Sequence, residues 1–190
     1  MIRAFIALEL KDQYIVEKIQ SYGKRLKNNQ ANLKLVDPQN LHMTVKFLGN
    51  IKESIAPKIY KILNEEINEK LFQNKTYQFQ LIGTGQFRKY SVLWIKLKGD
   101  IQFLQKVKDI VETLLYNQLN IEKDKRTQFK PHLTIGRLKS NKINYKNFES
   151  FKKLINDNKN LEFGFFKINE IKFKQSVLAP KGPIYSDLVY

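Results

Sequence analysis

Hydrophobic and polar positions alternate along several short segments of the chain, and each such segment predicts a β-strand. Period-two alternation sends successive side chains to opposite faces of a strand, so that one face can be buried. This pattern occurs in "LHMTVKFL", "TYQFQLIG" and "HLTIGRL", whereas "IRAFIAL" and "YSVLWIKL" are short apolar runs typical of buried strands. Further strands are expected in "FFKINEIKFKQSVL" and "PIYSDLVY".

Other segments repeat their apolar residues three and four positions apart, which predicts amphipathic helices. One follows Asp12 and another follows Asp100, two residues suited to cap a helix N-terminus. A third carries Pro57 in its expected first turn, where proline loses no hydrogen bond. The predicted apolar faces are Ile15, Ile19, Tyr22 and Leu26; Ile55, Ile59, Ile62 and Leu63; Leu104, Val107, Val111 and Leu114 or Leu115; and Phe148, Phe151, Leu154 and Ile155.

The order of these elements repeats along the chain. His42 and His132 lie 90 residues apart, and each half reads strand, helix, His-x-Thr strand, helix, strand. A shift of 90 residues places Phe5 of the first strand on Ile95. We therefore expect one bilobal α+β domain over residues 1–190, with approximate repeat halves 1–86 and 90–190. Its two pseudo-twofold-related lobes should carry mainly antiparallel sheets that face a central cleft, with helices outside.

Charge and composition narrow the class of partner. The 34 Lys and Arg residues outnumber the 18 Asp and Glu residues and give a formal net charge of +16. This surplus favours RNA as a partner, but a genome biased toward Lys, Asn and Ile codons would produce the same composition. The chain has no cysteine, no signal peptide pattern and no apolar run of about 20 residues. We expect a cytoplasmic monomer that does not associate with membranes.

The chain's only two histidines each stand two positions before a threonine. Alternation predicts one shared face for His42, Thr44 and Lys46 in the first strand, and for His132 and Thr134 in the second. The core side is expected to take Met43, Val45 and Phe47 in the first strand, and Leu133 and Ile135 in the second. A twofold relation between lobes would bring both His–Thr pairs to one cleft.

Two imidazoles that face one site can act as a general acid and a general base, because histidine titrates near neutral pH. Threonine hydroxyls and nearby cations can hold the anionic oxygens of a phosphoryl group between them. With two His, no Cys and no acidic cluster near either His, no metal and no cofactor are expected. The pattern thus favours metal-independent phosphoryl chemistry.

The segments "NLHMTVKFLG" and "FKPHLTIGR" resemble the two signatures of the two-histidine (2H) phosphoesterase superfamily. Within it, the chain is most similar to RNA 2′,3′-cyclic phosphodiesterases, also called 2′-5′ RNA ligase-like proteins. "RAFIAL" resembles the opening strand of that family, and "SVLAPKGPIYSDL" resembles its C-terminal strand and turn. In one departure, "LKLV" stands before the first signature, where such proteins often have a Trp.

The resemblance implies a bilobal antiparallel fold and metal-independent hydrolysis of RNA 2′,3′-cyclic phosphate ends to 2′-phosphomonoesters. It implies that His42 is the proton donor to the leaving oxygen and that His132 is the proton acceptor from water. Thr44 and Thr134 complete the two motifs as catalytic residues. Sequence alone does not separate this activity from cleavage or joining of 2′-5′ linkages at the same site. A non-catalytic RNA-binding module is a third hypothesis, which the repeated His-x-Thr argues against.

Three basic residues are candidate substrate contacts. Arg137 matches a basic residue that commonly follows the second motif in the family. Strict alternation would turn Arg137 away from His132, but Gly136 could allow a β-bulge that re-aims it. Lys46 and Lys130 are weaker candidates for phosphate contacts, because lysine is so abundant that its position says little.

Overall fold

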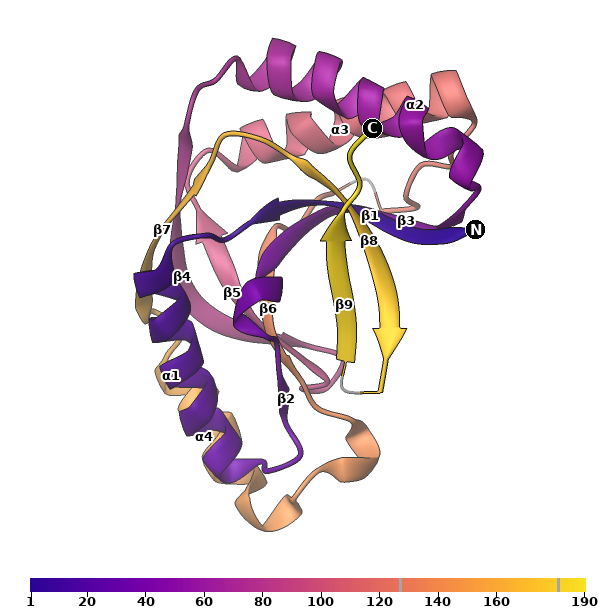
Figure 1. Ribbon diagram of the computed structural model, residues 1–190. Helices are drawn as coiled ribbons and strands as arrows, with labels where there is room; N and C mark the ends of the chain where they lie inside the picture. The colour runs from indigo at the N-terminus through magenta and orange to yellow at the C-terminus, as the bar shows by residue number, and fades with distance from the viewer. Residues whose placement is uncertain (127, 181) are drawn as a thin grey trace.

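The computed structural model describes residues 1–126, 128–180 and 182–190, in which the strands form two antiparallel sheets (Figure 1). In the first sheet the strand order is β3 (His42–Ile51), β1 (Ile2–Glu9), β8 (Lys172–Ala179) and β9 (Gly182–Asp187). In the second sheet it is β2 (Lys34–Leu35), β6 (His132–Arg137), β5 (Val92–Lys98), β4 (Tyr77–Phe87) and β7 (Glu162–Ile168). The predicted strands are confirmed.

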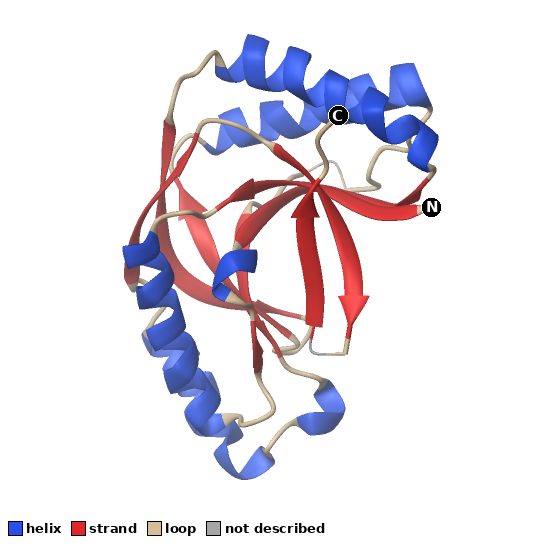
Figure 2. Ribbon diagram, in the orientation of Figure 1, coloured by secondary structure: helices blue, strands red, loops and turns tan. Residues whose placement is uncertain are grey.

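Helices cover the outer sides of the two sheets (Figure 2). The pair formed by α1 (Gln13–Asn29) and α4 (Phe148–Asp157) packs together on the second sheet. At the other end of the molecule, α3 (Ile101–Leu119) lies beside α2 (Ala56–Ile62), which continues as the π-helix η3 (Leu63–Phe72). The short 3-10 turns are η1 (Pro38–Asn40), η2 (Glu53–Ile55), η4 (Ser140–Lys142) and η5 (Tyr145–Asn147). The predicted α+β class is confirmed.

The capping residues act as the sequence predicts. Asp12 Oδ1 accepts a hydrogen bond of 3.1 Å from the backbone N–H of Ile15, at the start of α1. Asp100 Oδ1 accepts one of 3.0 Å from Phe103 at the start of α3. Each satisfies an amide that has no partner within its own helix.

The two sheets each take strands from both halves of the sequence. β4 belongs to the first half but pairs with β5, and β8 belongs to the second half but pairs with β1. The helices exchange in the same way, because α1 packs on the second sheet and α3 contacts β3 of the first. The ranges 1–86 and 90–190 therefore describe the repeat and not the lobes.

The strand pairings also correct the expected superposition of the halves. Ala7 pairs with Thr44 of the first motif, and Trp94 pairs with Thr134 of the second. The partner strands are therefore 87 residues apart, although the histidine strands are 90 apart. Phe5 does not correspond to Ile95, because the stretch from Ala7 to its partner Thr44 is three residues shorter than the stretch from Trp94 to its partner Thr134.

The buried apolar side chains form one continuous core that both sheets share with the helices. Within the described residues, no helix is both long enough and apolar enough to span a membrane.

Candidate active site

Strand β3 carries an extra residue directly after its His–Thr pair. Consecutive residues of β1 pair with Thr44 and Lys46, so Val45 is the extra residue of a β-bulge. Beyond the bulge the two faces exchange: Lys46 is 2% exposed and Phe47 is 67% exposed. The predictions that Lys46 shares the face of His42 and that Phe47 enters the core are wrong, because strict alternation ends at this bulge.

Lys46 is instead part of a buried ion cluster. Its Nζ donates to Glu112 Oε1 at 3.3 Å, to the Glu122 carbonyl at 2.9 Å and to Asp124 Oδ1 at 3.4 Å. Lys108 on α3 also donates to both carboxylates. The cluster ties β3 to α3 and to the loop that leads toward β6, so the role of Lys46 in this structure is not a phosphate contact.

Strand β6 has a bulge at the corresponding place. Neighbouring residues of β5 pair with Thr134 and Gly136, so Ile135 is extra. Ile135 and Gly136 are both buried, and Arg137 is exposed on the side of the histidine. The bulge expected near Gly136 is present, and it places Arg137 in the second strand where Phe47 stands in the first.

The backbone fixes the orientation of both imidazoles in the same way. His42 Nδ1–H donates to the Asn40 carbonyl at 2.6 Å, and His132 Nδ1–H donates to the Lys130 carbonyl at 2.8 Å. Because a carbonyl can only accept, each Nδ1 carries the proton and each Nε2 is left for chemistry. His42 Nε2 lies 3.1 Å from Thr44 Oγ1, whose hydroxyl donates to it when the imidazole is neutral.

The two imidazoles share one electrostatic environment. Burial is the main cause that lowers the pKa of each histidine, and the hydrogen bonds to Asn40 and Lys130 act in the opposite direction. The charge of Arg137 further lowers the pKa of both His42 and His132. A single guanidinium therefore lies within electrostatic reach of both imidazoles. Strands β3 and β6 are also in direct contact, so the two motifs lie at one site.

Aromatic rings surround His42. Its centroid lies 5.0 Å from that of Phe5 on β1 and 5.4 Å from that of Tyr185 on β9. Phe5 also lies 4.9 Å from Tyr185 and 6.5 Å from Phe47. These rings form an apolar wall on the side of the first motif.

His132 has an aromatic surrounding of its own. Its centroid lies 5.0 Å from that of Phe87 on β4 and 6.4 Å from that of Trp94 on β5. The Trp94 ring lies so close to Gly85 that a Cβ there would be 2.3 Å from the indole, so only glycine fits. Both histidines are thus held between a backbone carbonyl and aromatic rings.

Sequence reasoning missed several of these residues. Asn40 acts through its carbonyl, which no side-chain pattern reveals, and Tyr185 reaches His42 only through the packing of a distant strand. Phe47 could have been found only by expecting a second bulge. Lys130 contributes its carbonyl, and its exposed side chain makes no hydrogen bond or ion pair with the described residues. Its role as a phosphate contact stays a prediction.

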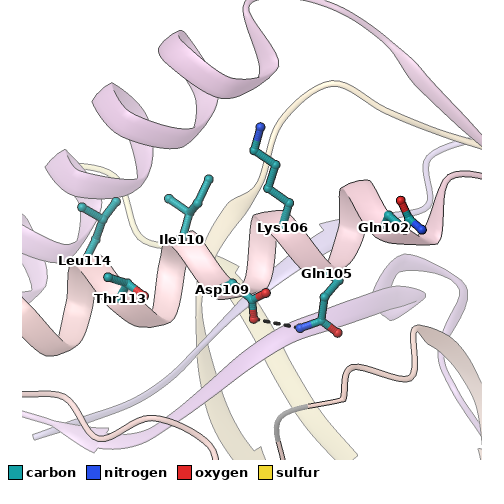
Figure 3. Close-up of a pocket in the computed structure, with 7 residues that line it drawn as sticks. All are labelled: Gln102, Gln105, Lys106, Asp109, Ile110, Thr113 and Leu114. Carbon is teal, nitrogen blue, oxygen red and sulfur yellow. Dashed lines mark hydrogen bonds between the residues drawn. The ribbon is translucent and has the colours of Figure 1, made fainter.

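A hollow of about 480 Å³ lies away from both histidines, on the outer face of α3 (Figure 3). Its lining comes from successive turns of that helix, and Gln105 Nε2 donates to Asp109 Oδ1, four residues further along, at 2.8 Å. The lining has no histidine and no pair of acidic residues, so it offers no chemistry for phosphoryl transfer. Nowhere in the described part of the chain do three or more His, Asp or Glu side chains gather as metal ligands.

Comparison with known proteins assigns the family. The model of the AKAP7 2′5′ RNA ligase-like domain matches residues 4–185. A protein of Methanothermobacter thermautotrophicus named RNA 2′,3′-cyclic phosphodiesterase is 30% identical, over 98% of this chain and 96% of its own length. A protein of the same name from Archaeoglobus fulgidus is 33% identical, over 98% of this chain and 97% of its own length.

Solved structures agree on the fold. TT0787 of Thermus thermophilus has a TM-score of 0.74 at 22% identity, over 99% of this chain and 96% of that one. LigT of E. coli complexed with 3′-AMP has a TM-score of 0.72 at 19% identity, over 99% of this chain and 95% of the LigT chain. The resemblance noted from the sequence is confirmed: the chain belongs to the 2′-5′ RNA ligase-like family of 2H phosphoesterases, together with the RNA 2′,3′-cyclic phosphodiesterases.

Proposed function

We propose that this protein hydrolyses the 2′,3′-cyclic phosphate at the end of an RNA to a 2′-phosphomonoester. The observation that carries the proposal is the pair of imidazoles, each with Nδ1–H bound to a carbonyl and both within reach of Arg137. Relatives at 30% identity or more over nearly the whole chain are named for this activity.

The reaction needs one proton acceptor and one proton donor in line with phosphorus. His132 Nε2 takes a proton from water as the water oxygen bonds to phosphorus. The bond from phosphorus to the 3′ oxygen breaks, and His42 Nε2–H protonates that oxygen. The products are a 2′-phosphomonoester and a 3′ hydroxyl, and one proton returns from His132 to His42 through solvent.

The surroundings of the histidines support this assignment of roles. Burial keeps His132 neutral at neutral pH, as a proton acceptor must be. The negative phosphate of a bound substrate opposes the effect of burial on His42 and favours its charged, proton-donating form. Thr44, Thr134 and Arg137 supply donors for the non-bridging phosphate oxygens, where negative charge develops.

The test uses a short RNA that ends in a 2′,3′-cyclic phosphate, with a chelator present. We expect His42→Ala and His132→Ala each to lower turnover by about 10²–10⁴-fold, with the fold intact by circular dichroism. Phosphorus NMR should show a 2′-phosphate as the only product. A folded variant with near-native activity would disprove the two-histidine mechanism, and a 3′-phosphate or a mixture would disprove the assigned direction.

The same preparation should be assayed on 2′-5′-linked oligonucleotides, because cleavage or joining of such linkages would run through the same two histidines. Activity confined to these substrates would replace the cyclic phosphate as the proposed substrate. A cytoplasmic location and a monomeric state complete the proposal, and size-exclusion chromatography with light scattering tests the latter.

A further inference from the structure

Tyr185 lies against the His42 imidazole, and the residues before and after Tyr185 on β9 are anchored to other strands. The Pro183 carbonyl accepts a hydrogen bond of 3.3 Å from Asn40 Nδ2, and the Asn40 carbonyl is the group that orients His42. One residue, Asn40, therefore fixes the imidazole and the strand that carries the tyrosine. The edge-on ring contact of 5.4 Å between Tyr185 and His42 is a consequence of this arrangement.

An ion cluster holds the other side of Tyr185. Lys174 on β8 donates to Asp187 Oδ1 at 2.5 Å and also to a carboxylate oxygen of Glu9 on β1. Glu9 is the residue that pairs with His42 across β1 and β3. These contacts tie β9 to β8 and β1, and so they hold the backbone that carries Tyr185 beside His42.

The Tyr185 hydroxyl is available as a hydrogen-bond donor next to the His42 ring. The side chain is half-buried, and its hydroxyl makes no hydrogen bond within residues 1–126, 128–180 and 182–190. Burial raises the pKa of this phenol, and the charges of Arg137 and Arg3 lower it. The hydroxyl is therefore protonated at neutral pH and lies within electrostatic reach of Arg137, as both histidines do.

We propose that Tyr185 contacts the substrate directly and that its hydroxyl donates a hydrogen bond to a non-bridging oxygen of the terminal phosphate, while its ring positions His42. The proposal rests on the phosphodiesterase function proposed above. It adds a donor from the C-terminal hairpin of β8 and β9 to the donors of the two motifs. Solvent reaches this hydroxyl, and it has no protein partner among the described residues, so it is free to exchange water for a phosphate oxygen as its acceptor.

The test separates the hydroxyl from the ring. Tyr185→Phe keeps the ring against Phe5 and His42 and removes only the donor, and Tyr60→Phe is the matched control at a half-buried tyrosine that packs on Tyr190. We expect Tyr185→Phe to lower kcat/KM on the cyclic-phosphate RNA by about ten- to a hundred-fold, as for the loss of a hydrogen bond to a charged group. Its pH profile should keep the position of the wild type. Tyr60→Phe should match the wild type.

A second variant tests the ring. Tyr185→Ala exposes His42 to water and relieves its burial, so the pH profile should move to higher pH in addition to the loss of activity. Equal kcat/KM for Tyr185→Phe and wild type would overturn the proposed hydrogen bond, whatever Tyr185→Ala does.

Binding of adenosine 2′-monophosphate, measured by calorimetry, keeps the inference independent of turnover. Tyr185→Phe should bind it about ten-fold more weakly than the wild type and Tyr60→Phe. Should the wild type hydrolyse no cyclic phosphate, the proposed function fails, yet weaker binding by Tyr185→Phe would still support the phosphate contact. Unchanged binding would refute it.

Discussion

The charge of Arg137 acts on both histidines and on Tyr185. It reaches this position through a bulge of one residue, which turns it to the face of His132. In the first motif Phe47 occupies the position that corresponds to Arg137. The two strands therefore share the bulge but carry different side chains after it, one aromatic and one cationic. This difference distinguishes a cationic side of the site from an aromatic one.

Replacing Arg137 by Gln should change the pH dependence as well as the rate. Its charge lowers the pKa of His42 and of His132, so its removal should raise both values. The bell-shaped profile of kcat/KM should then move to higher pH, and the maximum should fall by about ten-fold or more through loss of a charged donor.

The profile is measured on a cyclic-phosphate RNA across about pH 4–9. Arg25→Gln, on the exposed face of α1, is the control, because Arg25 has no part in the pKa of either histidine. An unmoved profile in Arg137→Gln would show that the guanidinium does not act on the imidazoles.

The bulges in β3 and β6 show what alternation along a strand can and cannot predict. Up to each threonine the two faces are as expected, because both strands are regular there. Gly136 gave a reason to expect a bulge in β6, whereas nothing in "TVKF" marks Val45 as the extra residue. The position of a bulge depends on pairing with β1, a strand some 40 residues distant, so the buried place of Lys46 could not be derived from its neighbours in sequence.

The ion cluster beyond the first bulge should contribute to stability. In Lys46→Met, Lys108 is the only cation that still pairs with Glu112 and Asp124 among the described residues. The charge that is lost is a buried one, because the Lys46 side chain is 1% exposed. We expect the free energy of unfolding to fall by about 3 kcal/mol, as when one partner of a buried ion pair is removed. Urea unfolding followed by circular dichroism measures this.

Lys98→Met is the matched control, since Lys98 lies exposed on β5 and forms no salt bridge with the described residues. It should change stability by less than about 0.5 kcal/mol, as is usual for surface substitutions. Equal stability of the two variants would mean that the cluster contributes nothing.

At the scale of the whole molecule, the net charge of +16 should act on the capture of long substrates. Each phosphate that a Lys or Arg neutralises releases condensed counterions, so binding weakens as salt rises. With two or three such contacts, kcat/KM on a ten-nucleotide RNA should fall about ten-fold between about 50 and 200 mM salt. A mononucleoside 2′,3′-cyclic phosphate lacks the chain and should show a much smaller change. Equal dependence for both would mean that the charge reflects codon usage and not RNA binding.

The exchange of strands between the halves determines the order in which a newly made chain can fold. β1 lies between β3 and β8 in the first sheet, so "RAFIAL" keeps an unpaired edge until residues 172–179 have left the ribosome. Unpaired apolar strands are sites of aggregation, and pairing across more than 160 residues of sequence is slow. β1 is thus synthesised long before the strand that encloses it, and a chaperone that holds the nascent chain would act on this segment.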